Sequence, residues 1–178
     1  LLKEEGLNYA NLPKGLVPFH KYDGYYATAF EEHLVEAAKY ASRNEKAKLH
    51  FTVTEDHLEK FKETFAAIQA RVEKETGVSF EVEYSFQKKT TDTIAVDFDN
   101  QPFRDDEGKI LFRPGGHGAL IENLNDIDAD LIFIKNIDNV IKQEHLETIS
   151  KYKKALAGEL INVQEKIFEI LNRIDKDG

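Results

Sequence analysis

Three segments of the sequence combine residue types that could bind a phosphorylated ligand. The first is Arg113–Gly118, with the sequence RPGGHG, in which three glycines flank His117. Glycine has no Cβ and lets a ligand approach the backbone closely. Backbone N–H groups near the start of a helix favour an anion or a base edge. The alternative is a plain turn that needs a positive φ, for which one glycine would suffice.

The second segment is KNIDN, which carries Asp138. It follows an apolar run that predicts a buried strand, and open α/β sheets bind ligands beyond the carboxyl ends of their strands. Mg²⁺ prefers carboxylate and phosphate oxygens. We therefore predict that Asp138 binds Mg²⁺. An Asp that caps the next helix is the alternative.

The third segment is LPKGLVPFHKY, which concentrates positive charge in an acidic chain. Lys14 lies between Pro13 and Gly15 on a stiffened loop, and His20 and Lys21 follow. This arrangement predicts phosphate binding by Lys14. The alternative is an ordinary solvated loop.

Two weaker signals favour structure over chemistry. Asp97-Phe98-Asp99 matches a metal-binding Asp-X-Asp pattern, but it falls in a predicted turn before Asn100. The remaining histidines lack metal-ligand spacing, and we interpret His33 and His57 as ordinary helix residues. No Ser-His-Asp arrangement rises above chance.

The elements that must position these segments follow from hydrophobic periodicity. The pattern predicts helices at Phe30–Arg43, Glu55–Glu75, Ala119–Leu124 and Gln143–Ile174, and strands at Leu49–Val53, Ser79–Ser85, Thr93–Phe98, Lys109–Arg113 and Asp130–Ile134. In the first helix we place Phe30, Leu34, Ala37, Ala38 and Ala41 on the buried face and Glu31, Glu32, Glu36 and Lys39 on the solvent face. Thr54 should cap the second helix and Gly77 should end it.

Strands that alternate with helices predict an α/β fold with a mostly parallel, Rossmann-like sheet flanked by helices. We divide the chain into an α/β domain at residues 1–142 and a helical segment at 143–178 that packs on it, with a break near Gly158. The first twenty or so residues, rich in Pro and Gly, are predicted to be irregular.

Composition excludes several classes of protein. The 178 residues carry a formal charge of −9, which argues against a general nucleic-acid binder. No apolar run approaches the ~18–20 residues that span a bilayer, and the absence of Cys excludes a disulfide framework or a thiolate zinc site. These features predict a cytoplasmic protein without a membrane partner. Because the chain begins at Leu1 and contains no Met, we interpret it as a fragment of a longer polypeptide.

Taken together, LPKGLVPFHKY, TDTIAVDFDNQPF and LFRPGGHGALIENLNDIDADLIFIKNIDNV resemble a Bacteroidetes family known as domain of unknown function 4301. The resemblance covers nearly the whole chain. It identifies a family whose activity is not established.

The sequence is more distantly similar to UDP-sugar pyrophosphorylases, through motifs in the same order. Pro13–Pro18 matches P-K-G-L-x-P, Phe86-Gln87 partially matches F-x-Q, Asp105–Lys109 fits D-x-x-G-K, Pro114–Gly118 matches P-G-H-G with one extra glycine, and Asn136–Asn139 matches N-x-D-N.

This resemblance implies a nucleotidyltransferase (glycosyltransferase-A-like) fold and a Mg²⁺-dependent reaction between a nucleoside triphosphate and a sugar phosphate. It implies that Lys14 contacts phosphates as the catalytic cation and that Asp138 is the metal ligand. His117 would lie near the sugar phosphate. The substrate-binding set would be Arg113, Gly115, Gly116, His117, Gly118 and Asn136.

One departure keeps other functions open. Pyrophosphorylases carry a G-x-G-T-R-like loop shortly before the P-K-G motif, and the twelve residues before Pro13 contain only Gly6 and no Arg. The loop either precedes Leu1 or is missing from the family. In the second case the chain would be a non-catalytic module that binds a nucleotide or sugar phosphate, and a purely structural α/β domain is the third possibility.

Overall fold

A computed structural model of the chain describes residues 9–177. Residues 1–8, which belong to the predicted irregular segment, lie outside the described residues. The chain forms two compact units, which are described separately. Unit 1 contains the chain up to Leu49, Phe61–Glu81 and the chain from Leu131 onward, and unit 2 contains His50–Lys60 and Val82–Asp130.

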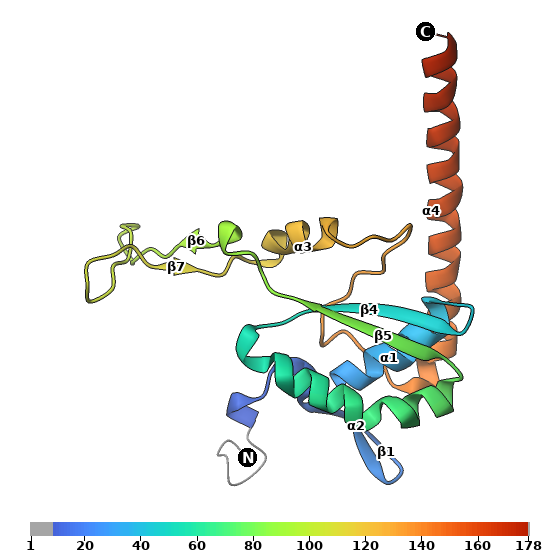
Figure 1. Cartoon of the computed structure of the whole chain (residues 1–178), viewed down its shortest axis with the longest axis horizontal. Helices are drawn as coiled ribbons and strands as arrows, with labels where there is room; N and C mark the ends of the chain where they lie inside the picture. Colours follow the sequence, from blue (N-terminus) through green and yellow to red (C-terminus); the bar gives the residue numbers. More distant parts are fainter. Residues whose placement is uncertain (1–8, 178) are drawn as a thin grey trace. The chain divides into compact units, whose positions relative to one another are not determined.

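Unit 1 begins with a hairpin where the sequence predicted a loop. Strand β1 (Pro18–Tyr22) pairs antiparallel with β2 (Tyr25–Thr28) (Figure 1). The tight turn between them is Asp23-Gly24, and Gly24 has φ +82°. Asp-Gly between alternating aromatic residues is a hairpin signal, so the sequence did carry this information.

Helix α1 (Ala29–Tyr40) confirms the first predicted helix. Thr28 caps it, because its hydroxyl accepts a hydrogen bond from the Glu31 N–H at 3.2 Å. On its apolar face Phe30 is fully buried and meets the rings of Phe61 and Phe65 edge-on, with centroids 5.4 and 6.3 Å away. This aromatic cluster is the centre of the core of unit 1.

A strand–helix–strand element follows, as predicted. It consists of β3 (Ser42–Arg43), β4 (Lys46–Thr52), a short 3-10 turn (Glu55–His57), α2 (Leu58–Thr76) and β5 (Ser79–Ser85). The Ser79 N–H donates to Glu45 O and the Val53 N–H to Ser85 O, each at 2.9 Å, so β4 and β5 run parallel. Gly77 ends α2 with φ +72°, as expected. The Thr54 hydroxyl, however, contacts His57 Nδ1 instead of capping the backbone.

The predicted mostly parallel sheet does not form. Among residues 9–177 the sheets have two or three strands, and β4–β5 is the parallel pair. The predicted strand at Asp130–Ile134 is wrong, because this segment has no strand assignment and Ile134 is 73% exposed. Phe133 instead packs edge-on against Tyr40 of α1, at 5.0 Å between centroids. This segment therefore contacts a helix through a side chain, and its backbone does not pair with a strand.

Unit 2 contains the predicted hairpin in a reduced form. Strands β6 (Thr93–Ile94) and β7 (Phe112–Arg113) pair antiparallel, and two isolated bridges lie beyond them. The Asp97 carboxylate accepts hydrogen bonds from the backbone N–H groups of Asp99 and Gln101, both at 2.9 Å. The Asp-X-Asp pattern is therefore a turn, as its sequence context indicated.

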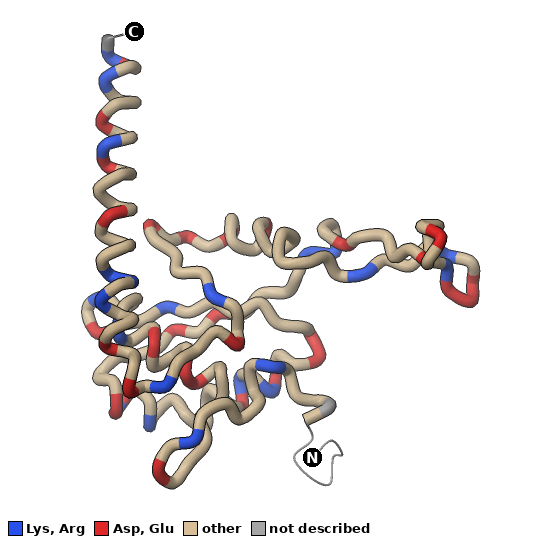
Figure 2. The backbone as a smooth tube through the Cα atoms, turned by 180° about the vertical axis from the view of Figure 1, so that it is seen from behind, with Lys and Arg blue, Asp and Glu red and all other residues tan. Residues whose placement is uncertain are grey.

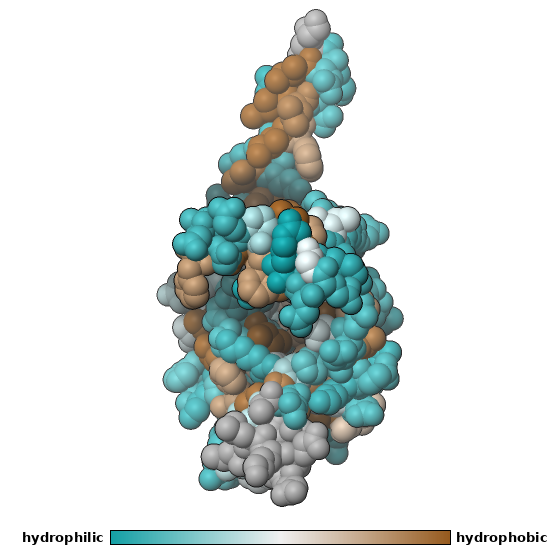
Figure 3. All heavy atoms as spheres, turned by 90° about the vertical axis from the view of Figure 1, so that its left-hand side faces the viewer, coloured by the Kyte–Doolittle hydropathy of each residue, from teal (hydrophilic) through white to brown (hydrophobic). Residues whose placement is uncertain are grey.

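The remaining α-helices of residues 9–177 are α3 (Ile121–Asn125) and α4 (Gln143–Asp177), and short 3-10 helices lie at Tyr9–Asn11, Lys14–Leu16 and Lys89–Thr91. Another 3-10 helix (His117–Leu120) runs into α3, and unit 1 ends in α4, which is continuous through Gly158. The predicted break near Gly158 is therefore wrong. In α4, Leu146 and Ser150 are buried, whereas large apolar side chains from Leu156 onward are exposed. Figure 3 shows these side chains on one side of the helix, and Figure 2 shows acidic and basic residues interspersed along it.

Phe30→Ala tests whether the aromatic cluster stabilises the fold. We expect the free energy of unfolding to fall by about 3–5 kcal/mol, because a fully buried ring is removed and leaves a cavity. The matched control is Phe98→Ala, since Phe98 is completely exposed, and it should change stability by less than ~0.5 kcal/mol. Urea denaturation of both variants measures the difference, and equal effects would contradict the packing described.

Candidate functional site

The fold of unit 1 brings Lys14 and Asp138 together from positions 124 residues apart. Lys14 lies in a 3-10 turn (Lys14–Leu16), and its Nζ donates to Asp138 Oδ2 at 2.5 Å. The hydrogen bond from Lys14 lowers the pKa of the Asp138 carboxyl. Both side chains remain open to solvent, with exposed fractions of 64% and 40%. The pair is therefore accessible to a ligand.

Gly15 explains how the two segments come so close. A Cβ at Gly15 would lie 3.0 Å from Ile137 Cγ1 and 3.1 Å from the Phe61 ring. Gly15 is buried, so the missing side chain lets Ile137 pack directly against the backbone beside Lys14. The glycine of the P-K-G motif thus sets the separation between the lysine loop and the aspartate loop.

The buried carboxylate of Glu36 on α1 contacts the aspartate loop, which is the segment at residues 135–141 that contains Asp138. Glu36 is 1% exposed and forms an ion pair with Lys135. The second Glu36 oxygen accepts a hydrogen bond from the Ile141 N–H at 3.3 Å. Tyr40 also donates to Glu36, at 3.0 Å. Glu36 therefore holds both ends of the segment that contains Asp138.

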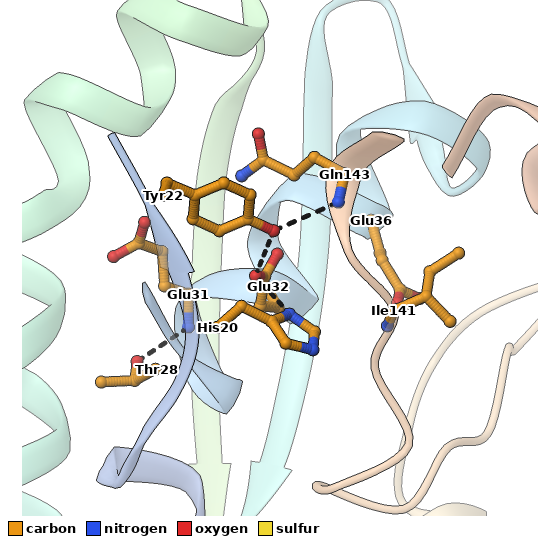
Figure 4. Close-up of polar contacts among 8 residues, drawn as sticks. All are labelled: His20, Tyr22, Thr28, Glu31, Glu32, Glu36, Ile141 and Gln143. Atoms are coloured by element: carbon orange, nitrogen blue, oxygen red, sulfur yellow. Dashed lines mark hydrogen bonds and ion pairs between the residues drawn. The ribbon is translucent and has the colours of Figure 1, made fainter. Parts of the chain in front are cut away.

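Glu32 forms a second buried junction, between the β1–β2 hairpin and the start of α4 (Figure 4). Its Oε1 accepts from the Tyr22 hydroxyl at 2.6 Å and lies 2.8 Å from His20 Nδ1. The Tyr22 oxygen in turn accepts a hydrogen bond from the Gln143 N–H at 3.1 Å. Burial and the hydrogen bond to Glu32 raise the pKa of Tyr22, so this hydroxyl stays protonated as the donor.

His33 contacts the aspartate loop directly. It is 9% exposed, and its Nε2 lies 3.0 Å from the carbonyl oxygen of Ile137, the residue before Asp138. Because a carbonyl can only accept, Nε2 carries the proton. Burial lowers the pKa of His33 and favours the neutral ring. His33 is a helix residue, as predicted, but its contact with the loop was not foreseen.

The prediction that Glu31, Glu32 and Glu36 face solvent is wrong. All three are at most 3% exposed, because the polar face of α1 is covered as fully as its apolar face. Glu31 is paired with Arg71 of α2 at 2.9 Å, and burial raises the pKa of its carboxyl. Hydrophobic periodicity identifies the apolar face of a helix. It cannot show that residues distant in the sequence, such as Arg71 and Lys135, cover the opposite face. Sequence reasoning therefore missed His33, Glu36 and Lys135.

The glycine-rich loop lies in unit 2, and its glycines have different surroundings. A Cβ at Gly115 would lie 2.9 Å from both Thr91 O and Ala119 Cβ, so close packing requires glycine there. A Cβ at Gly116 or Gly118 would meet no atom within 4 Å. None of the three has a positive φ, so the expected left-handed turn is not the reason for glycine. Packing and backbone conformation explain Gly115 and leave Gly116 and Gly118 unexplained.

The other predicted substrate-binding residues are exposed. Arg113 is the last residue of β7, and His117 is the first residue of the 3-10 helix that follows the loop. Asn136 lies in unit 1, where its carbonyl accepts from the Asn139 N–H at 3.0 Å and closes the turn around Asp138. Asp138 does not cap the next helix, because α4 begins five residues later, at Gln143.

Comparison with known proteins identifies the family of the chain. The model of a domain of unknown function, DUF4301, matches residues 1–178. The chain belongs to the DUF4301 family. No curated protein matches it, and no solved structure does.

The DUF4301 chain has few protein ligands to offer a metal ion. Within residues 9–177, no three His, Cys, Asp or Glu residues are grouped so that they could hold one. Asp138 supplies one exposed carboxylate, and Mg²⁺ is commonly held by one or two carboxylates together with substrate phosphates. The donor set therefore fits an ion shared with a phosphorylated substrate and does not fit a metal held by protein alone.

In the described part of the DUF4301 chain, no helix is both long enough and apolar enough to cross a membrane.

The buried His33 ring should make stability depend on pH. A His pKa that lies below ~6.5 in the folded state means that the unfolded chain binds more protons as the pH falls through ~6.5. The free energy of unfolding should therefore drop on acidification, by at most ~1.4 kcal/mol per pH unit from this residue. His33→Gln keeps an N–H donor for Ile137 O and removes the titration. Urea denaturation from pH 7.5 to 5.5 should show a shallower decline in this variant, and identical declines would contradict the assignment.

Proposed function

We propose that the DUF4301 chain is part of a Mg²⁺-dependent sugar-1-phosphate nucleotidyltransferase that resembles UDP-sugar pyrophosphorylases. The observation that carries the proposal is the exposed Lys14–Asp138 pair, which buried charged groups of α1 hold in place. Burying charged groups is unfavourable unless they are paired and hydrogen-bonded. Buried charged groups contribute little net stability to a loop, but their directional hydrogen bonds fix the position of the Asp138 carboxylate.

The chemistry divides between the two exposed residues. The Lys14 ammonium would bind phosphate oxygens of a nucleoside triphosphate, and Asp138 would hold the Mg²⁺ that accompanies the nucleotide. The ion supplies neutralisation of the charge that develops on the phosphates. An oxygen of the sugar phosphate forms a bond to the α-phosphorus, and the bond from that phosphorus to the pyrophosphate oxygen breaks. Both substrates are already ionised, so the reaction needs positioning more than a general base.

The glycine-rich loop supports the same proposal independently. Gly116 and Gly118 are free of packing and conformational demands, so a ligand that approaches the backbone is a physical reason for glycine at both positions. Their N–H groups would then face the nucleotide or the sugar. His117 would lie beside the sugar phosphate.

Asp138→Asn tests the metal role. We expect it to abolish the Mg²⁺-dependent part of UTP affinity and to leave the fold intact, because the amide keeps the shape of the side chain and loses its charge. The matched control is Asp128→Asn, at an exposed aspartate outside the pair. Calorimetric titration with UTP, with and without Mg²⁺, measures the difference. An undiminished Mg²⁺ effect in Asp138→Asn would overturn the metal assignment.

Alanine substitution in the glycine loop separates binding from packing. Gly118→Ala should leave the free energy of unfolding unchanged or raise it by up to ~1 kcal/mol, since the added methyl group meets open space. The same substitution should weaken nucleotide binding. Gly115→Ala is the contrasting variant, because its methyl group would collide with Thr91 O, and it should lower the melting temperature. Unchanged affinity in Gly118→Ala would remove the loop from the site.

Turnover distinguishes the enzyme from a binding module. The full protein is mixed with UTP, Mg²⁺ and a panel of sugar 1-phosphates, and release of pyrophosphate is followed. Lys14→Ala should abolish release while leaving the melting temperature within a degree or two, because Lys14 is exposed. Tight binding of UTP without any pyrophosphate release would favour the non-catalytic module.

A further inference from the structure

A polar cluster at one edge of unit 2 belongs to neither the Lys14–Asp138 pair nor the set of predicted site residues. Strands β4 and β5 run parallel and end at Thr52 and Ser85. The carboxyl ends of parallel strands are where α/β proteins bind their ligands. The polar side chains that gather there are the subject of the inference.

Ser85 is the hub of this cluster. Its Oγ lies 2.8 Å from His50 Nε2 and 3.3 Å from Thr52 Oγ1, and it accepts a hydrogen bond from Asn123 Nδ2 at 2.9 Å. Three polar side chains, two from β4 and one from α3, therefore converge on one hydroxyl of β5. His50 is also 3.5 Å from a carboxylate oxygen of Glu83.

Asn123 is a buried member of the cluster, and within residues 9–177 its side-chain oxygen is an unsatisfied hydrogen-bond acceptor. It is 5% exposed, and its Nδ2 also donates to the Phe86 carbonyl at 2.7 Å. Because that carbonyl can only accept, the amide orientation is fixed and Oδ1 faces away from it. Among the described residues Oδ1 has no hydrogen-bond partner. A buried acceptor without a donor is unfavourable, and a ligand hydroxyl would supply the missing donor.

The cluster is continuous with the glycine-rich loop. A Cβ at Gly115 would lie 3.7 Å from Gln87 Nε2, and Asn123 follows the loop by one short helical stretch. The end of β5 and the open glycines therefore belong to the same part of unit 2.

The character of the cluster indicates which part of a ligand it would bind. Its four members are two hydroxyl groups, an amide and an imidazole, and none is a lysine or an arginine. The next lysine along the chain, Lys88, is paired with Asp126 at 2.7 Å. A phosphate would need unpaired positive charge. A ligand hydroxyl can donate to Asn123 Oδ1 or exchange a hydrogen bond with the exposed Thr52 hydroxyl. Ser85 already has three partners, so it holds the other side chains in position.

We infer that Ser85, Asn123, His50 and Thr52 form a subsite for the uncharged, hydroxyl-bearing part of the substrate, at the carboxyl ends of β4 and β5. The inference rests on the proposed function, in which that part is the sugar. The subsite determines specificity and takes no part in the bond-making step.

The test compares the affinity of the full protein for UDP with its affinity for UDP-glucose, UDP-galactose and UDP-N-acetylglucosamine, in the presence of Mg²⁺. The ratio of the two dissociation constants isolates the contribution of the sugar. We expect at least one sugar to improve affinity by ~5-fold or more, since two or three hydrogen bonds are added. Ser85→Ala should bring this ratio close to one and leave the affinity for UDP unchanged.

Thr52→Val keeps the test decisive if Ser85→Ala unfolds, because Thr52 is exposed and valine has the same shape. It should reduce the ratio, whereas the control Thr90→Val, at an exposed threonine elsewhere in unit 2, should not. A ratio near one in the wild type, or a ratio that survives in folded Ser85→Ala or Thr52→Val, would overturn the subsite and leave the proposed function standing. If neither UDP nor any UDP-sugar binds, the proposed function falls and the subsite falls with it.

Discussion

The burial of the polar face of α1 is the constraint on which unit 1 depends. Glu32 and Glu36 would be strongly unfavourable inside a protein if they were unpaired. They are tolerable because Tyr22 donates to Glu32, and because Lys135 and the Ile141 N–H reach Glu36. The helix and the aspartate loop therefore satisfy each other's buried polar groups. This pairing places the turn around Asp138 on α1 and not at the end of a sheet strand.

The same constraint explains why two loops meet. Hydrogen bonds from α1, through His33 and Glu36, hold the aspartate loop. Ile137 of that loop packs on the backbone of Gly15. Lys14 then lies within reach of Asp138 without any buried contact of its own. An exposed ion pair of this kind contributes little to stability, typically below ~1 kcal/mol. Its position is thus a consequence of the buried network and not a cause of the fold.

The glycines of the chain fall into classes that only coordinates can separate. Gly24, Gly77 and Gly108 adopt a positive φ and serve turns. Gly15 and Gly115 permit close packing against a neighbouring side chain or carbonyl. A Cβ at Gly116, Gly118 or Gly158 would meet no atom within 4 Å, and none of these three has a positive φ. Counting glycines in a motif would have given all of them the same meaning.

Local elements were largely determined by the sequence itself. Periodicity and capping residues located α1, α2, β5 and α4 closely, because a helix stripe or a strand alternation is a property of neighbouring residues. The P-K-G and N-x-D-N segments predicted Lys14 and Asp138 as site residues, and the fold places these two side chains in contact. The Asp-Gly turn of the first hairpin was also present in the sequence, although its significance was missed.

The tertiary structure alone decided what covers each face and which distant segments meet. The apolar run at Leu131–Ile134 has the composition of a strand, yet it packs on α1 through Phe133, because a strand needs a free sheet edge and no local pattern reports one. Glu36 has the composition of a solvent face, yet it is buried, because its partners Lys135 and Ile141 lie about a hundred residues away in the chain. Lys14 and Asp138 are brought together across 124 residues, and His50 and Asn123 reach Ser85 across 35 and 38 residues. Sequence determined the elements and the chemistry of their residues, and long-range packing decided which of those residues share a site.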